Sequence, residues 1–322
     1  MNLEIPKTQW IGTKDGFYSY ESYPPFLNLV TASFGSAVLN TTLFNLVPKI
    51  IPLIFSILTL LIGALYSLKL RNYYIIGLLS IVPLEWLFVH TLNNDIVVAF
   101  FASLVFLVAL KEINTKNVII LALFTSFALL SNYNALVLAL VTLFYIKNNS
   151  KNRKLVIMFI AIVALLAGPW YLRNLLLYGD PLYVPSLIHT EDYKPARGAG
   201  IFFENYFLGF FPSCIVGLHL NYITLFLTIL IIFFTMRNLE DRFKHMLSLK
   251  IVDPIALFLP LLLISWILFG YTYSDLFSPR YLISGILPLS VVASSSIKSK
   301  YGFWIIYIGF MYFFFHNFIN CL

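Results

Sequence analysis

The stretch LVPKIIPLIFSILTLLIGALYSL, residues 46–68, decides the fold class of this chain of 322 residues. Its only charged side chain is Lys49, and as an α-helix it would be about 34 Å long. The hydrocarbon core of a bilayer is roughly 30 Å thick, so this helix could cross it. Further apolar runs lie near residues 73–92, 95–111, 118–132, 134–147, 154–171, 218–236, 252–271, 281–297 and 302–319. The sequence therefore predicts an all-α fold, a polytopic transmembrane bundle of about ten spans that forms one membrane-embedded domain over residues 1–322.

Composition agrees with a membrane protein and excludes several other classes. The chain is 60% hydrophobic and 11% charged, whereas a soluble domain is roughly 25% charged. The net charge of +7 is explained by basic cytoplasmic loops, so we expect no nucleic-acid partner. Cys214 and Cys321 form neither a metal-binding spacing nor a disulfide framework.

Basic residues predict which side of the membrane each loop faces. Most of the 21 Lys and Arg residues fall in alternate loops, which the positive-inside rule places in the cytoplasm. Both termini and residues 168–217 are then extracytoplasmic, and we expect an integral protein of the plasma membrane. The basic loops contain Lys69, Arg71, Lys111, Lys116, Lys147, Lys151, Arg153, Lys154, Arg237, Arg242, Lys244, Lys250, Lys298 and Lys300.

Two outer segments are expected beside the spans. Residues 1–45 form an outer N-terminal segment, in which YPPFLNLVTASFGSAVL, residues 23–39, predicts a helix lying at the membrane surface. The alternative for residues 23–39 is a weak transmembrane helix. Residues 172–217 form a long outer loop, and a loop of this length is more often functional or mobile than a plain connection.

Three charged residues at the outer side are candidates for chemistry. Asp95 begins a span, where it either caps the helix or offers a carboxylate to a metal ion or an acceptor. Arg173 lies in GPWYLRNLLLYGDPLYVPS, residues 168–186, where it either meets a ligand, reaches to the interface or balances Asp180. Arg280 follows Ser-Pro at a helix start, a position that suits phosphate but also simple anchoring.

The order of five segments resembles a known group of enzymes. The segments are YPPFLNLVTASFG, NNDIVVAFF, LLSNYNALVLAL, GPWYLRNLLLYGDPLY and SPRYLISGILPL, and together they cover roughly residues 23–290. The pattern is similar to the membrane-embedded glycosyltransferases of the C-type fold, which take sugars from polyprenyl-phosphate donors. Among these, it most resembles the dolichyl-phosphate-mannose–protein mannosyltransferases and the aminoarabinose transferase of lipid A.

The resemblance implies roles for particular residues. Asp95 takes the place of an acidic residue that begins a span after the second outer turn, and its position makes it our candidate base. Arg173 and Arg280 take the places of arginines near the lipid phosphate. Asn132 stands where a lysine is often found. The family also begins with a transmembrane helix and an acidic motif, whereas this sequence begins in what would be the first outer loop. The residues implied to line the substrate are Tyr23, Pro24, Pro25, Tyr171 and Asp180.

The expected function is transfer of a sugar from a polyprenyl-phosphate donor to a protein, lipid or glycan acceptor, beside membrane lipid. A divalent metal ion is the one cofactor considered, with His189 and either Glu191 or Asp192 as ligands, although a single histidine in a polar loop is usually an ordinary loop residue. Two other classes stay open. One is a non-catalytic remnant or partner subunit of the same fold, and the other is a lipid-sugar transporter or flippase.

Overall fold

The helices found confirm the all-α prediction for the part of the chain that can be described. The computed structural model describes residues 26, 30, 33, 47–79, 94–150, 152–179, 181–182, 238–246, 252–272, 285–297 and 304. Throughout these residues the regular secondary structure is helical, and short helical segments also occupy 74–79 and 238–246. The principal helices are α2 (Val47–Leu70), α4 (Asn94–Ala109), α5 (Thr115–Leu129), α6 (Ala135–Asn149), α7 (Arg153–Leu166), α8 (Gly168–Tyr178), α11 (Pro254–Thr272) and α12 (Ile286–Ser296).

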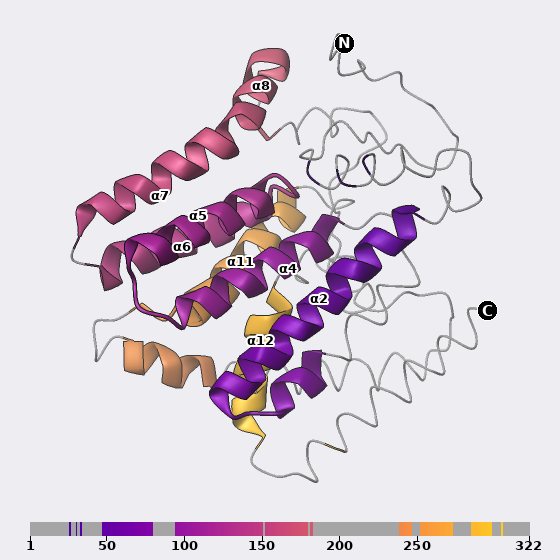
Figure 1. Cartoon of the computed structure of the whole chain (residues 1–322), viewed down its shortest axis with the longest axis vertical. Coiled ribbons are helices and arrows are strands. Elements are labelled where there is room, and N and C mark those ends of the chain that lie inside the picture. The colour runs from indigo at the N-terminus through magenta and orange to yellow at the C-terminus, as the bar shows by residue number, and fades with distance from the viewer. Residues whose placement is uncertain are drawn as a thin grey trace.

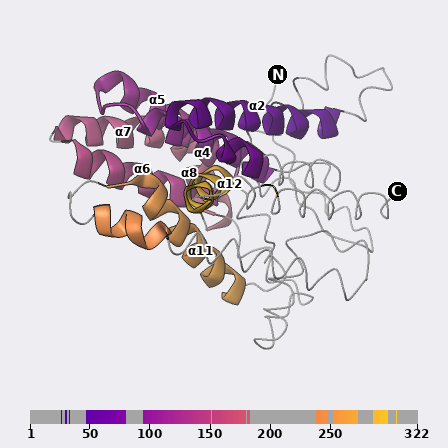
Figure 2. The same ribbon diagram turned by 90° about the horizontal axis from the view of Figure 1, so that it is seen from below.

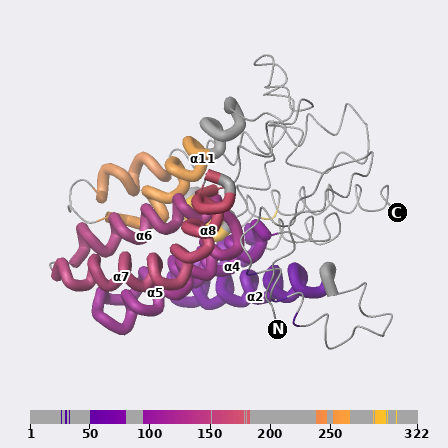
Figure 3. The backbone as a smooth tube through the Cα atoms, turned by 90° about the horizontal axis from the view of Figure 1, so that it is seen from above, coloured from indigo at the N-terminus to yellow at the C-terminus, as the bar shows by residue number. Residues whose placement is uncertain are grey.

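These helices pack in two layers (Figures 1 and 2). Helices α2, α4, α5 and α7 contact one another in that order in the first layer, and α6, α11 and α12 form the second. Figure 3 shows α5, α6 and α7 side by side. Helix α12 is seen nearly along its axis in Figure 2, so it crosses α2 and α7 steeply.

Helix α4 is the centre of the bundle. It is apolar around its whole circumference, a pattern that favours burial on all sides, and it contacts α2, α5, α6, α11 and α12. Val97, Ala99 and Ala102 are completely buried. The rings of Phe106 and Phe258 meet edge to face, with centroids 5.2 Å apart, and join α4 to α11.

Large aliphatic side chains are exposed along the outer faces of the bundle. Helix α2 from Ile50 to Leu70 is long and apolar enough to cross a membrane, and α7 with α8 would be a second such span if the bent pair is counted as one. Within the described residues the other apolar stretches are shorter, and they are Asn94–Ala109, Thr115–Leu129, Ala135–Asn149 and Pro254–Ser265. Ten spans therefore stay a prediction. The expected spans 218–236 and 302–319 lie outside the described residues, except for Trp304. The large exposed hydrophobic side chains on α2 are Ile50, Leu53, Ile54, Ile57, Leu61, Leu65, Leu68 and Leu70.

The span expected over residues 154–171 is not one straight helix. Helix α7 ends at Leu166, and α8 begins at Gly168 after a bend of 52°. Pro169 lies in the first turn of α8, where proline is tolerated because its missing N–H has no partner to lose. Helix α8 ends at Gly179, whose φ of 72° is readily reached by glycine. Residues 172–178 of the expected outer loop are therefore helical.

Alternation of helix direction gives the bundle two ends. We call the end that holds Lys69, Lys111, Lys147 and Arg153 the basic end, and the opposite end, where α4 begins, the Asp95 end. Hydrogen bonds join the helix ends that meet at the basic end. The Tyr145 hydroxyl near the end of α6 donates to the Ala109 carbonyl at the end of α4 over 2.7 Å.

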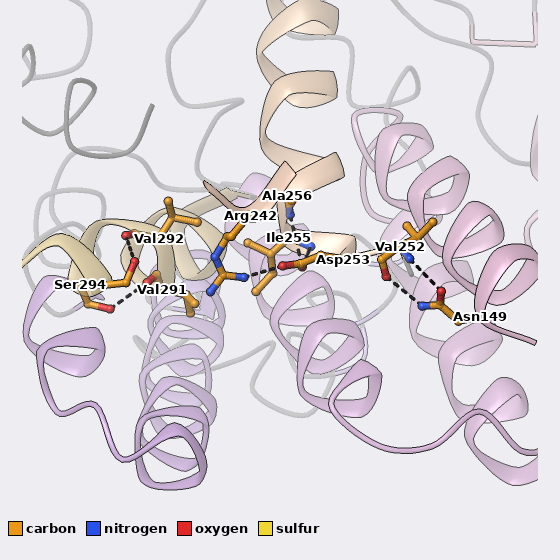
Figure 4. A network of polar contacts seen from close by, with 10 residues as sticks. Asn149, Arg242, Val252, Asp253, Ile255, Ala256, Val291, Val292 and Ser294 are labelled. Atoms are coloured by element: carbon orange, nitrogen blue, oxygen red, sulfur yellow. Dashed lines mark hydrogen bonds and ion pairs between the residues drawn. The ribbon is translucent and has the colours of Figure 1, made fainter. Parts of the chain in front are cut away.

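A network of polar contacts closes the basic end (Figure 4). Asn149 and Val252 exchange two hydrogen bonds of 2.8 Å, which join the end of α6 to the start of α11. The Asp253 carboxylate accepts the backbone N–H of Ile255 over 2.9 Å and pairs with Arg242 over 2.6 Å. The sequence signal for this cap is Asp253 directly before Pro254, because Asp is favoured at the N-cap and Pro at the first helical position.

Two asparagines cap helices at the basic end. Asn114 and Asn152 are extended at the N-cap positions of α5 and α7, and their side-chain oxygens accept the backbone N–H groups of Asn117 and Lys154. Such caps satisfy donors that a helix leaves unpaired. Polar side chains at the basic end therefore hold helix ends together.

Candidate functional site

Asp95 lies in the first turn of α4 and is almost completely buried. Only 4% of the residue is exposed, which is unusual because a buried carboxylate needs hydrogen bonds to offset its lost hydration. The side-chain amide of Asn132 donates one of them to Oδ1 of Asp95 over 2.8 Å. The helix dipole of α4 also favours a negative charge at this position.

Asn132 belongs to the short turn between α5 and α6, and both ends of its amide are used. Its nitrogen reaches Asp95, and its oxygen accepts the backbone N–H of Asn134 over 3.2 Å. The residue itself is 1% exposed. Asn132 therefore fixes the Asp95 carboxylate relative to the turn that starts α6.

Two further segments meet this turn at the end of α5. The backbone N–H of Phe26 donates to the Leu130 carbonyl over 2.8 Å, and the Tyr171 hydroxyl donates to the Leu129 carbonyl over 2.9 Å. Four of the five segments that carry the sequence resemblance thus contribute to one place in the fold, through Phe26, Asp95, residues 129–132 and Tyr171.

Phenylalanine rings of α2, α4 and α5 pack around Phe26. The ring of Phe26 lies 5.4 Å from that of Phe101 and 5.5 Å from that of Phe127, measured between centroids. It also meets Phe55 of α2 at 6.4 Å. Phe26 therefore packs among α2, α4 and α5 and ties the N-terminal segment to the core.

Arg173 lies two residues beyond Tyr171 on α8. Its guanidinium lies 5.0 Å from the ring centre of Trp170, a cation–π geometry, and donates to Oδ1 of Asn174 over 3.1 Å. Asn174 is 1% exposed and donates to the Pro181 carbonyl. The large exposed hydrophobic side chains of α8 are Leu172, Leu175, Leu176 and Leu177.

The structure accounts for only part of the predicted site. Asp95 and Tyr171 are joined to the same turn, and Arg173 shares the helix of Tyr171. The remaining predicted residues lie outside the described residues, and they are Tyr23, Pro24, Pro25, Asp180, His189, Glu191 and Arg280. Of the segment that contains Arg280, residues 285–289 are described, and Gly285 lies against Phe258, Leu259 and Leu262 of α11.

Sequence reasoning missed the parts played by Asn132 and Asn134. The sequence pattern marked Asn132 only as a residue that stands in place of a lysine. In the structure its side-chain amide donates a hydrogen bond to Asp95, the predicted catalytic residue. Asn134 has a buried Nδ2 atom without a hydrogen-bond partner. The available signal was the short Asn-Tyr-Asn sequence at the turn, because such residues either cap a helix or meet a ligand.

The described residues provide no cluster of three or more His, Cys, Asp or Glu side chains that could hold a metal ion. Within these residues Asp95 accepts a hydrogen bond from the side-chain amide of Asn132. The proposed ligands His189 and Glu191 lie outside these residues, so a metal site stays a prediction.

Comparison with known proteins places the chain in a family. Neither the curated proteins nor the solved structures include a match to it. Residues 26–210 match a family described as a domain of unknown function, DUF8201. This region begins at Phe26 and contains Asp95, Asn132 and Tyr171. Because the match covers more than half of the sequence, the protein belongs to the DUF8201 family.

Proposed function

We propose that this protein is an integral membrane glycosyltransferase that moves a sugar from a polyprenyl-phosphate donor to an acceptor at the Asp95 end. The observation that carries the proposal is the buried Asp95 carboxylate, held by Asn132 where four chain segments meet. A carboxylate kept in one orientation is suited to general-base catalysis. The five-segment resemblance supplies the reaction class.

The membrane location is supported by the side chains that face outward. Exposed Ile and Leu side chains continue along α2 from Ile50 to Leu68 and along α8 from Leu172 to Leu177. An apolar surface of this extent is suited to lipid rather than water. With the basic end in the cytoplasm, the Asp95 end lies at the extracytoplasmic face, and the remaining spans complete a bundle of about ten.

The proposed reaction needs a base and a site for the leaving phosphate. Asp95 takes the proton of the acceptor hydroxyl, whose oxygen forms a bond to the anomeric carbon of the sugar. The bond from that carbon to the phosphate oxygen breaks, and polyprenyl phosphate leaves with the electron pair. Arg173 and Arg280 stabilise the charge on this phosphate.

The exposed leucines of α8 support the proposal of a lipid donor. Leu172, Leu175 and Leu176 are exposed beside Arg173 on the same helix. A polyprenyl chain would pack on these leucines while its phosphate reaches the guanidinium. The 52° bend before Gly168 directs α8 away from the axis of α7, as a helix lying in the membrane interface requires.

The test is an assay of membranes that contain the full chain, supplied with radiolabelled polyprenyl-phosphate sugars with and without EDTA. We expect transfer of label to an acceptor, and loss of about 10²–10³-fold in Arg173→Ala and Arg280→Ala. Arg153→Ala at the basic end is the matched control and should leave the rate unchanged. An EDTA-sensitive rate would support the metal ion.

The same assay separates the alternatives. Movement of intact donor between leaflets, without any glycosylated product, would support a lipid-sugar transporter. A chain that neither transfers nor moves any donor would be a non-catalytic partner subunit. Either outcome contradicts the glycosyltransferase proposal.

A further inference from the structure

Asn134 begins helix α6 but does not cap it. It occupies the N-cap position with helical φ and ψ of −56° and −23°, and its side chain makes no capping hydrogen bond. The equivalent residues of α5 and α7, Asn114 and Asn152, are extended and do cap their helices. Asparagine is among the best N-cap residues, so α6 forgoes a stabilising contact that its sequence offers.

The amide nitrogen of Asn134 instead lies buried without a partner. Among the described residues only two buried side-chain atoms lack a hydrogen bond, and they are Nδ2 of Asn134 and Oγ1 of Thr125. Thr125 is completely enclosed within α5, whereas Asn134 is only partly buried. A buried donor without a hydrogen-bond partner lowers the stability of the fold. A bound ligand that supplies an acceptor would remove this penalty.

The position of Asn134 indicates which other polar groups such a ligand would contact. Its backbone N–H donates to Oδ1 of Asn132, whose Nδ2 donates to Asp95. Asn134 is therefore joined through its backbone to the side chain of Asn132, and through that side chain to the Asp95 carboxylate. A carboxylate acceptor and an unpaired amide donor on residues linked in this way suit an oxygen-rich ligand, such as a sugar or its phosphate.

We infer that the side-chain amide of Asn134 is a substrate-binding group, which donates a hydrogen bond from Nδ2 to an oxygen of the bound sugar phosphate beside Asp95. This inference rests on the proposed function and adds a binding residue to it. The oxygen belongs either to a sugar hydroxyl or to the phosphate, because both are acceptors of an amide N–H.

The test combines thermal unfolding with ligand binding for Asn134→Leu, which keeps the approximate size of the side chain and removes its donor. Replacing an unpaired buried polar group by an apolar one is neutral or stabilising, so Tm should stay unchanged or rise. The Kd of the purified full chain for undecaprenyl-phosphate mannose should rise about tenfold, as expected for one lost hydrogen bond.

The matched control is Asn152→Ala at the basic end, which removes a real cap. It should lower Tm and leave the Kd unchanged. Undecaprenyl phosphate serves as the second probe. An equal loss of affinity for both probes in N134L assigns the bond to the phosphate, and a loss confined to the mannose form assigns it to the sugar.

Three results would overturn the inference. A Tm loss in N134L as large as that of N152A, or failure of N134L to fold, would make the amide structural. Unchanged affinity of N134L beside a wild type that binds would contradict the inference alone. A wild type that binds neither probe would contradict the proposed donor, and the inference would fall with it.

Discussion

At the basic end of the bundle Asn114 and Asn152 each cap a helix, whereas at the Asp95 end Asn134 starts a helix and caps nothing. The charged residues differ in the same way. Asp253 caps α11 and is paired with Arg242, while Asp95 is buried against the amide of Asn132. Polar groups at the basic end complete the fold, and those at the Asp95 end are arranged in a way that suits a ligand.

This difference separates two reasons for placing polar side chains in an apolar bundle. Helix ends leave N–H and C=O groups unpaired, so a network that pairs them stabilises the structure. A group kept unpaired, such as Nδ2 of Asn134, lowers stability unless it binds something. Substitutions at the two ends should therefore affect different quantities.

The largest effect on stability is expected for Asp253→Ala. It removes the cap of α11 and the partner of Arg242, so the free energy of unfolding should fall by about 2 kcal/mol. Thermal unfolding of the purified protein measures this change. Asp241→Ala is the control. Asp241 is exposed on the short helical segment 238–246 that contains Arg242, so its replacement should have no resolvable effect.

Asn149→Ala should be next, at about 1.5 kcal/mol, because it removes both hydrogen bonds between the end of α6 and Val252. The neighbouring Asn148, whose side chain is exposed and bonded within its own helix, provides the control variant. Equal effects at the two positions would show that the link between α6 and α11 does not contribute to stability.

At the Asp95 end, Tyr171→Phe should cost about 1 kcal/mol, since it removes the hydrogen bond to the Leu129 carbonyl. The same change should also lower the transfer rate, because it loosens α8 against the turn that holds Asn132. Tyr73→Phe is a suitable control, as Tyr73 is 70% exposed. A stability loss without any change in rate would make Tyr171 purely structural.

The smallest effect concerns Glu240 and Lys244, which form an exposed ion pair of 2.6 Å at the basic end. The hydrogen bond from Lys244 lowers the pKa of Glu240, and the same bond raises the pKa of Lys244. The pair therefore contributes between these two pKa values, and its contribution is lost as pH falls through that of Glu240 or rises through that of Lys244.

Glu240→Gln should accordingly change Tm at neutral pH by much less than Asp253→Ala, and at acidic pH, where Glu240 is protonated, by nothing. Unfolding curves at both pH values test this. A large effect at neutral pH would mean that an exposed pair contributes more than solvent screening allows.

Much of the helical framework was predictable because apolar runs and basic loops are read directly from the sequence. The starts of α2, α4 and α6 lie within a few residues of the expected spans. The bend before Gly168 was missed, although Gly-Pro at that point is a recognised break signal. The apolar side chains continue past this point into Trp170, Tyr171 and Leu172, and this continuity hides the bend.

The site was predictable only in part. Asp95 stood out as a charged residue at a span boundary, but the hydrogen bond from Asn132 joins residues 37 positions apart. Such a contact depends on how α4 and α5 pack, which spacing along the chain does not reveal. The same is true of Phe26, whose ring reaches three helices.

The central claim is that the carboxylate at the Asp95 end serves chemistry and the one at the basic end serves the fold. The most direct test compares Asp95→Asn with Asp253→Asn for transfer rate and Tm, in membranes with equal amounts of protein. The side-chain oxygen that D95N retains can still accept the Asn132 amide, so we expect Tm to be nearly unchanged and the rate to fall at least about 100-fold. Asp253→Asn should lower Tm and keep its rate per folded molecule. Full transfer activity in D95N would contradict the account.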